Sequence, residues 1–272
     1  MRNPYIFRTN INFCLLCFCL GLILVFTAEY SCDSPDSIKN PYVDGSKIFI
    51  GGKISNYSGK IETVYSPIID SSTKEKFIIG KLSQMTSEDS VMALEHAKQA
   101  WNSGQGIWPQ MTMDTRIWHI EQIILKLNEK RSEIVEILQW EIGKSIKDAE
   151  SEFDRTISFM KASIEEAINF QAQSKIWKTI SGIYAKVKRA AIGIMLCLGP
   201  FNYPFNETYA TMIPALLMGN VVILKLPTIG GLAHILTMEM YASILPPGVI
   251  NFVSGSGRIT IPPVRFIFQI LI

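Results

Sequence analysis

Three short polar segments in the second half of the chain each follow an apolar run. The three segments, each with the apolar run that it follows, are 199–204 (GPFNYP) after 192–198, 225–228 (KLPT) after 221–224, and 254–258 (SGSGR) after 249–253. If the apolar runs are neighbouring parallel strands, their carboxyl ends meet at one edge of the sheet, which is where open α/β sheets bind ligands. The sequence therefore predicts its functional site at this edge.

The first segment offers an amide donor in a constrained turn. Asn202 lies between Pro200 and Pro204, which fix the backbone and lack an N–H group. A neutral amide donor at a strand end suits a developing oxyanion. The alternative is an asparagine that bonds to its own turn backbone, and the spacing leaves both interpretations open.

The second and third segments suggest a dinucleotide. Dinucleotide-binding folds carry a carboxylate after the second strand, where it holds the 2′-hydroxyl of NAD. Lys225 and Thr228 occupy that region instead, and both can bind a 2′-phosphate, which favours NADP. The alternative is a solvated lysine at a strand end. Gly255 and Gly257 allow a pyrophosphate to approach the backbone. A lone G-x-G is a weak signal of nucleotide binding, and it matters here only because it follows the third predicted strand, at the edge where a ligand is expected.

Alternating and helical patterns precede this region. Short strands are predicted within residues 48–80. A helix is predicted from Thr86, as its N-cap, to Asn102, with Val91, Leu94, Ala97 and Trp101 on one face. Residues 114–173 have helical periodicity with breaks near Asn128 and at Gly143, and residues 183–188 alternate as a partly exposed strand would.

The region 192–257 has the pattern of a βαβαβ unit. Helical stretches at 205–218 and 230–244 separate the three apolar runs, and such spacing is typical of parallel strands. Runs without alternation indicate strands buried on both faces. The predicted fold class is α/β, with a Rossmann-type parallel sheet preceded by a helical region and short strands.

Several longer motifs resemble the aldehyde dehydrogenase superfamily. They are 199–206 (GPFNYPFN), 214–228 (PALLMGNVVILKLPT), 245–251 (LPPGVIN), 141–145 (EIGKS) and 151–156 (SEFDRT). Within it, FNYP and KLPT resemble the NADP-dependent non-phosphorylating glyceraldehyde-3-phosphate dehydrogenases. The resemblance covers residues 41–258 and implies the N-terminal part of that family's nucleotide-binding domain.

The resemblance implies a role for each candidate residue. Asn202 would be the catalytic amide that stabilises the thiohemiacetal oxyanion. The residues implied to bind NADP (or NAD) are Lys225, Thr228, Gly255, Gly257 and Pro200. Tyr203 and Arg155 match substrate-contacting positions, with Arg155 near the phosphate of glyceraldehyde 3-phosphate, although a helical arginine is more commonly a surface salt-bridge partner.

The sequence departs from the family in its chemistry. The family oxidises an aldehyde to the acid through a cysteine nucleophile and a glutamate that activates water, and both are expected beyond residue 272. Cys197, inside a predicted buried strand, should be an inert thiol.

Residues 259–272 are expected to be an apolar tail foreign to the fold. We therefore expect a truncated, incomplete enzyme, and the alternative is a catalytically inactive nucleotide-binding fragment.

Composition excludes some functions and leaves location open. A net charge of +2 without a basic stripe argues against nucleic-acid binding. Cys14 and Cys17 have no nearby histidine, so no metal site is expected. Residues 1–31 resemble a signal peptide or a membrane anchor, and the third alternative is a mispredicted first exon. The first two would imply the secretory pathway or membrane contact, whereas the family resemblance implies a cytoplasmic location and, for the full-length enzyme, a homo-oligomer. The glycosylation triplet at Asn206 lies beside the predicted site, where a glycan would be disruptive, and this argues against a location in the lumen of the secretory pathway.

Overall fold

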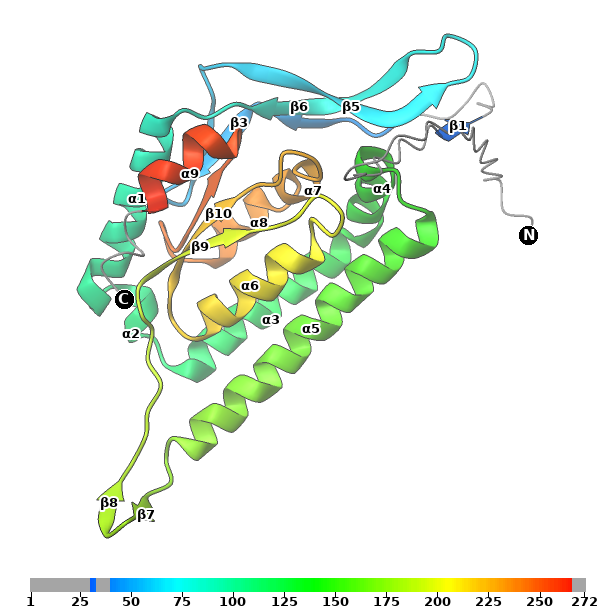
Figure 1. The fold of residues 1–272 in the computed structure, drawn as a ribbon. Coiled ribbons are helices and arrows are strands. Elements are labelled where there is room, and N and C mark those ends of the chain that lie inside the picture. Colours follow the sequence, from blue (N-terminus) through cyan, green and yellow to red (C-terminus); the bar gives the residue numbers. More distant parts are fainter. Residues whose placement is uncertain (1–29, 33–39, 266–272) are drawn as a thin grey trace, which may run out of the picture.

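The computed structural model describes residues 30–32 and 40–265 of the chain (Figure 1). Its strands are β1 (Tyr30–Cys32), β2 (Val43–Gly45), β3 (Lys47–Ile50), β4 (Lys53–Asn56), β5 (Ile61–Asp70), β6 (Lys76–Ser83), β7 (Lys178–Ile180), β8 (Ile183–Ala185), β9 (Ile194–Leu198), β10 (Val221–Lys225) and β11 (Ile250–Val253). Its helices are α1 (Ser87–Trp101), η1 (Asn102–Gly104), α2 (Ile107–Gln110), α3 (Met113–Glu129), α4 (Arg131–Ile142), α5 (Ile146–Gln173), α6 (Asn206–Leu217), α7 (Leu232–Ile235), α8 (Met238–Ile244) and α9 (Gly257–Arg265).

A three-stranded parallel sheet lies at the centre of the molecule. Its strand order is β11-β10-β9, and Lys225 at the end of β10 is aligned with Leu198 of β9 and Val253 of β11. Every residue of β10 and β11 is buried, as expected for strands covered on both faces. The predicted βαβαβ unit is confirmed, and the three candidate segments do leave the sheet at one edge.

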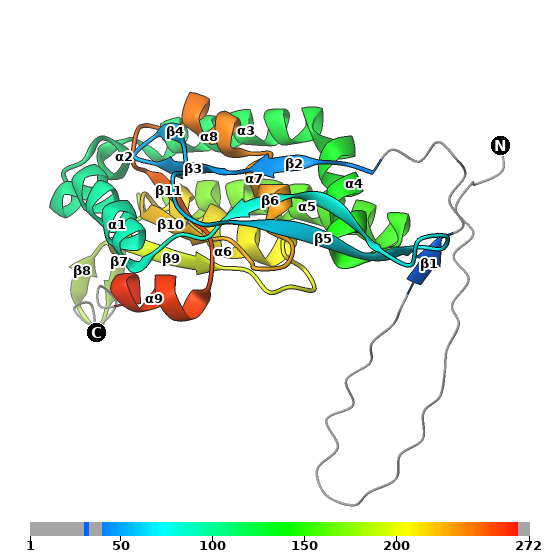
Figure 2. The ribbon, with the colours of Figure 1, turned by 90° about the horizontal axis from the view of Figure 1, so that it is seen from above.

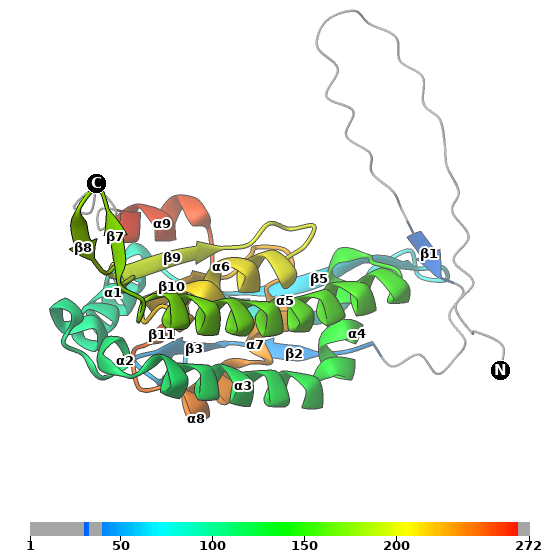
Figure 3. The ribbon, with the colours of Figure 1, turned by 90° about the horizontal axis from the view of Figure 1, so that it is seen from below.

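Helices cover both faces of this sheet. Helix α1 packs on β10 and β11 from one side, while α6 packs on β9 and β10 from the other. Helices α3 and α5 lie outside α6 and run side by side along the molecule (Figure 3). The helical region predicted over 114–173 thus forms an outer layer whose inner faces meet the central unit.

The sequence located the start of α1 and misassigned part of its buried face. Thr86 is the N-cap in a capping box with Asp89, as its residue type indicates. The buried residues of the helix are Ser90, Ala93, Leu94 and Ala97, whereas Val91 is 44% exposed. Val91 is only one residue from Ser90, so it projects about 100° away from that buried stripe.

A mixed four-stranded sheet forms another layer of the molecule. Long strands β5 and β6 pair with each other, and the sheet order is β1-β5-β6-β2. Strands β5 and β6 run across the top of the molecule in Figure 1, and in Figure 2, which is seen from that side, they lie in front of the helices. Strands β3 and β4 form a two-stranded hairpin, and β3 contacts β11, so this region continues the central core.

Three predicted elements differ from the observed ones. Residues 183–188 form a strand only at Ile183–Ala185, paired with β7 in a hairpin that projects from the body (Figure 1). The helix predicted over 230–244 is divided into α7 and α8. Residues 257–265, partly assigned to a foreign tail, form α9 against α1 with Thr260 and Val264 buried. The tail expectation for 266–272 lies outside the described residues.

The N-terminal segment is described only at β1. Residues 30–32 pair in parallel with Ile68, Ile69 and Asp70 of β5. The expected signal or anchor run and the cysteines Cys14, Cys17 and Cys19 lie outside the described residues. Within the described ranges, none of the helices combines the length and apolarity needed to cross a bilayer.

Candidate functional site

The loop after β9 presents an exposed amide. Pro200 and Asn202 are exposed, while Pro204 is buried. The Asn202 side chain makes no hydrogen bond to any residue of the described part of the chain. The alternative of a turn asparagine bonded to its own backbone is therefore not observed, and the amide remains available as a donor at the sheet edge.

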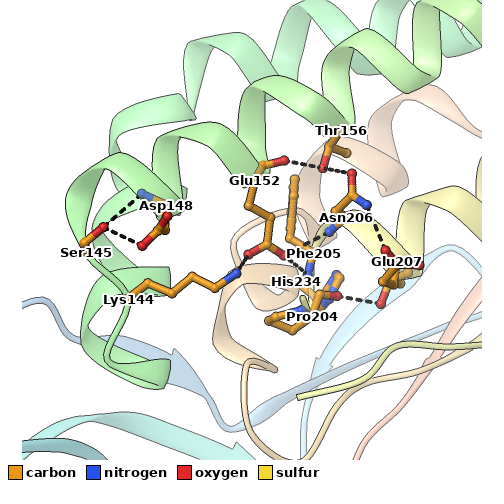
Figure 4. A network of polar contacts seen from close by, with 11 residues as sticks. Lys144, Ser145, Asp148, Glu152, Thr156, Pro204, Phe205, Asn206, Glu207 and His234 are labelled. Carbon is orange, nitrogen blue, oxygen red and sulfur yellow. Dashed lines mark hydrogen bonds and ion pairs between the residues drawn. The ribbon is translucent and has the colours of Figure 1, made fainter. Parts of the chain in front are cut away.

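A buried glutamate from α5 fixes the end of this loop. Glu152 is 1% exposed, and its Oε1 accepts the backbone N–H groups of Phe205 (2.9 Å) and Asn206 (3.1 Å). These are the first N–H groups of α6, which have no partner within the helix. A carboxylate is also favoured near a helix N-terminus. Glu152 thus anchors Phe205 and Asn206 (Figure 4), which directly follow the turn that carries Asn202.

Lysine and arginine side chains surround Tyr203 on the same loop. The Lys144 ammonium forms an ion pair with Glu152 Oε2 and lies 4.0 Å from the Tyr203 ring centroid. The Arg155 guanidinium lies 5.9 Å from the same ring. The predicted pair of Tyr203 and Arg155 is therefore brought together. No acidic side chain of the described residues pairs with Arg155.

The motif 141–145 is the turn that makes this arrangement. Gly143 has a φ of 69° and caps α4 in the left-handed conformation, which glycine adopts without strain. Ser145 caps α5 by accepting the N–H of Asp148 at 3.1 Å. Between the caps, Lys144 is directed toward Glu152 and the loop after β9 (Figure 4).

Lys225 is not a solvated lysine. It is 6% exposed at the end of β10, and burial lowers the pKa of its ammonium to about 8. Its Nζ donates to the carbonyl of Leu226 (2.5 Å). Because an ammonium has three donors, two remain without a partner among the described residues. A buried lysine with unused donors can hold an anionic or hydroxyl-rich group.

The remaining predicted cofactor residues flank the same edge. Thr228 is exposed three residues beyond Lys225. Gly255 has a φ of 93°, and a Cβ there would lie 3.0 Å from the backbone nitrogen of Met85, so only glycine fits without strain. Gly257 is the first residue of α9. The three loops therefore all leave the central sheet at its carboxyl edge.

Cys197 is not an activated nucleophile. It is buried within β9, and burial raises the pKa of its thiol to about 11. A thiol with that pKa is almost entirely protonated at neutral pH, and the thiolate is the reactive form. This agrees with the inert role predicted for it.

The residues that hold the loops carry no functional signature in the sequence motifs. Glu141 continues the apolar spacing of Ile134, Ile137 and Leu138, and Glu152 lies beside Phe153 in the buried face of α5. A carboxylate at a position where helical spacing demands an apolar residue is costly to bury. That mismatch was the available signal for both.

Comparison with known families identifies the architecture. The model of the aldehyde dehydrogenase family matches residues 60–262. Among relatives, the NADP-dependent glyceraldehyde-3-phosphate dehydrogenase of Streptococcus equinus is 30% identical over 66% of this chain, and the peroxisomal aminoaldehyde dehydrogenase 1 of Malus domestica is 27% identical over 71%. The chain spans 38% and 39% of the length of these relatives.

Solved structures agree in fold. The NADP-dependent glyceraldehyde-3-phosphate dehydrogenase of Bacillus halodurans, solved with NADP, superposes with a TM-score of 0.68 and 25% identity over 81% of this chain and 45% of its own. The betaine aldehyde dehydrogenase of Staphylococcus aureus, solved with NAD+, has a TM-score of 0.68 and 22% identity over 79% of this chain and 43% of its own. The predicted fold class is therefore confirmed.

The Lys144–Glu152 pair predicts a non-additive effect on stability. Lys144→Met leaves the buried Glu152 carboxylate without its cation, so we expect the free energy of unfolding in urea to fall by about 3 kcal/mol. Adding Glu152→Gln keeps one oxygen for the two backbone N–H groups and removes the unpaired charge. The double variant should therefore recover part of the loss. If the double variant loses as much stability as Lys144→Met and Glu152→Gln lose together as single variants, the two residues are not coupled.

Proposed function

Because the chain belongs to the aldehyde dehydrogenase family, we propose that it forms the nucleotide-binding and oxyanion-stabilising part of an NADP-dependent enzyme that oxidises an aldehyde to the acid. The observation that carries the proposal is the convergence of the three loops at the carboxyl ends of β9, β10 and β11. When bound, NADP supplies the hydride acceptor of the reaction.

The groups around β10 fit a 2′-phosphorylated nucleotide. Lys225 has two unused donors, and the hydroxyl of Thr228 is exposed nearby in sequence. No carboxylate follows β10 to repel a phosphate or to hold the 2′-hydroxyl of NAD. The buried ammonium also attracts a phosphate more strongly than a solvated one would, because water screens it less. Gly255 and Gly257 leave room for a pyrophosphate beside the backbone.

Asn202 is proposed as the oxyanion donor. Attack of a thiolate on an aldehyde places negative charge on the carbonyl oxygen, and an amide N–H held at that point stabilises it. Glu152 fixes the backbone immediately after the loop, which limits how far the amide can move. The thiolate itself must come from a residue other than Cys197, whose thiol stays protonated.

The proposed substrate is a phosphorylated aldehyde, with glyceraldehyde 3-phosphate as the leading candidate. Arg155 is exposed and unpaired among the described residues, and it lies beside Tyr203 on the Asn202 loop. Guanidinium groups bind phosphate with parallel hydrogen bonds. Relatives named as glyceraldehyde-3-phosphate dehydrogenases support this choice, while the aminoaldehyde dehydrogenase among the relatives represents the alternative of another aldehyde.

A second candidate function is a nucleotide-binding protein without dehydrogenase activity. Within residues 40–265 the only cysteine is Cys197, whose thiol is buried and protonated, so this range holds no activated thiol. Mixing the purified chain with NADP and glyceraldehyde 3-phosphate, and following absorbance of the reduced nicotinamide, separates the two. Turnover supports the enzyme, whereas nucleotide binding without turnover, in this chain and in any longer product of the same gene, supports the second function.

We further propose a cytoplasmic location and, for the full-length enzyme, a homo-oligomer, both from the family. Asn206 is 8% exposed, and its side chain bonds to Glu207 and Thr156 inside the fold. A glycan on Asn206 is therefore incompatible with this packing, which argues against synthesis of the chain into a glycosylating compartment, where the acceptor would be exposed before folding.

Replacing Lys225 should weaken NADP binding selectively. Lys225→Met removes the donors proposed for the 2′-phosphate, so we expect NADP affinity to fall about tenfold or more while NAD affinity changes less. Isothermal titration of both nucleotides measures the two effects. Lys147→Met, at an exposed position of α5, is the matched control and should bind as the wild type does. Equal losses for NADP and NAD would contradict the assignment.

The same lysine predicts a pH dependence. Because burial lowers the pKa of Lys225 to about 8, the free protein loses this charge as the pH rises through that value. NADP affinity should therefore decline above about pH 8, by up to about tenfold per pH unit, while NAD affinity declines less. Titrations between pH 6.5 and 9.5 test this. A flat NADP profile, or the same profile in Lys225→Met, would refute it.

Arg155 should govern recognition of the substrate phosphate. We expect Arg155→Gln to reduce affinity for 3-phosphoglycerate, the corresponding acid, by about tenfold, because a charge-assisted bidentate contact is lost. Binding of unphosphorylated glycerate should not change. Lys161→Gln, exposed on the same helix, provides the control. If the wild type binds both acids equally, the phosphate assignment is wrong.

A further inference from the structure

A second buried glutamate holds the loop after β10. Glu141, in the last turn of α4, is 3% exposed. Its Oε1 accepts the backbone N–H groups of Gly230 (2.8 Å) and Gly231 (2.9 Å), and its Oε2 accepts that of Leu232 (3.1 Å). About ninety residues separate the donors from the acceptor. The contact therefore joins two distant parts of the chain.

These three N–H groups have no local acceptor. They stand at the start of α7, where intrahelical partners are missing, and the N-cap position is Gly231, which has no side chain to supply one. All three residues are buried, so water cannot replace the acceptor. A buried backbone N–H left without a partner costs about 1–3 kcal/mol, and the Glu141 carboxylate satisfies three at once.

The conformation at Gly230 shows how closely this loop is packed. Gly230 has a φ of 91°, and a Cβ there would lie 2.4 Å from Pro204. The loop after β10 therefore lies directly against the loop after β9. Pro204 in turn is linked to α7, because its carbonyl lies 3.0 Å from His234 Nε2. A displacement of residues 230–232 would be transmitted to both loops.

Residues 225–232 are thus fixed at both ends. At one end, Lys225 belongs to the central sheet, and the N–H of Leu226 donates to the carbonyl of Val253 (2.8 Å). At the other end, Glu141 holds residues 230–232. Thr228 and Ile229 between these anchors are exposed. The anchors decide where the Thr228 hydroxyl stands relative to Lys225.

We propose that Glu141 is a positioning residue for cofactor binding, holding the loop 226–232 so that Lys225 and Thr228 act together on the 2′-phosphate of NADP. This inference rests on the proposed function. No lysine or arginine within the described ranges pairs with Glu141, so the backbone N–H groups are its partners. Burial is the larger effect and raises the pKa of Glu141 to about 7, while the three N–H groups oppose it by favouring the ionised form. The carboxylate and the loop conformation therefore stabilise each other.

The test compares nucleotide affinities of Glu141 variants of this chain. Glu141→Ala removes both oxygens that accept the three N–H groups, and the isosteric Glu141→Gln keeps one oxygen but places an amide NH2 near an N–H donor. We expect NADP affinity to fall about tenfold in Glu141→Ala and less in Glu141→Gln, with NAD affected less than NADP. Glu136→Gln, exposed on the same helix, should match the wild type.

The ratio of NADP to NAD affinity distinguishes positioning from mere destabilisation. Partial unfolding lowers both affinities by the same factor, whereas a displaced loop lowers the ratio. An unchanged ratio in both Glu141 variants would overturn the inference. Glu141→Gln guards against the case in which Glu141→Ala fails to fold, since it preserves the shape of the side chain.

Hydrogen exchange separates this inference from the proposed function. Amides 230–232 should exchange faster in both variants without any nucleotide, while amides of β10 stay protected. If the wild type binds neither nucleotide, the proposed NADP site fails, and the claim that Glu141 aids cofactor binding fails with it. Faster exchange would then support only the anchoring of the loop, and unchanged exchange would overturn that as well.

Discussion

The arrangement of this site depends on how the first N–H groups of α6 and α7 are satisfied. Both helices begin just after a candidate functional loop, and both begin inside the protein, where water is excluded. Each uses a carboxylate from the outer helical layer as acceptor: Glu152 for α6 and Glu141 for α7. The position of each loop is consequently tied to helices far away in sequence, and the outer layer is part of the site although none of its capping atoms need touch a ligand.

The two carboxylates meet the cost of burial in different ways. Glu152 is paired with Lys144, and the same lysine lies over Tyr203, so charge balance and loop position are joined in one cluster. Glu141 relies on three backbone N–H groups instead, and burial raises its pKa to about 7. An apolar residue at either position would avoid the cost of burying a charge but would leave buried backbone N–H groups without an acceptor. The carboxylates are retained where backbone donors would otherwise be left unsatisfied.

Close packing joins the two loops. Gly230 contacts Pro204, and the Pro204 carbonyl accepts the hydroxyl of Thr208 while also facing His234. The proposed oxyanion donor and the proposed nucleotide contacts are therefore held by one connected set of interactions. Because packed interiors respond to displacement as a unit, changes at one loop should be felt at the other.

The sequence by itself determined the βαβαβ unit, its buried strands, the N-cap at Thr86 and the three polar segments, because apolar runs, helical periodicity and turn residues act over short distances. It also indicated Asn202, Lys225, Tyr203 and Arg155 through motifs. It did not reveal that Val91 faces solvent, that residues 259–265 continue into α9, or that Glu141 and Glu152 reach across the fold. Only the tertiary structure decided these, since burial of a side chain and the partner of a long-range hydrogen bond depend on which surfaces meet, and no local pattern encodes that.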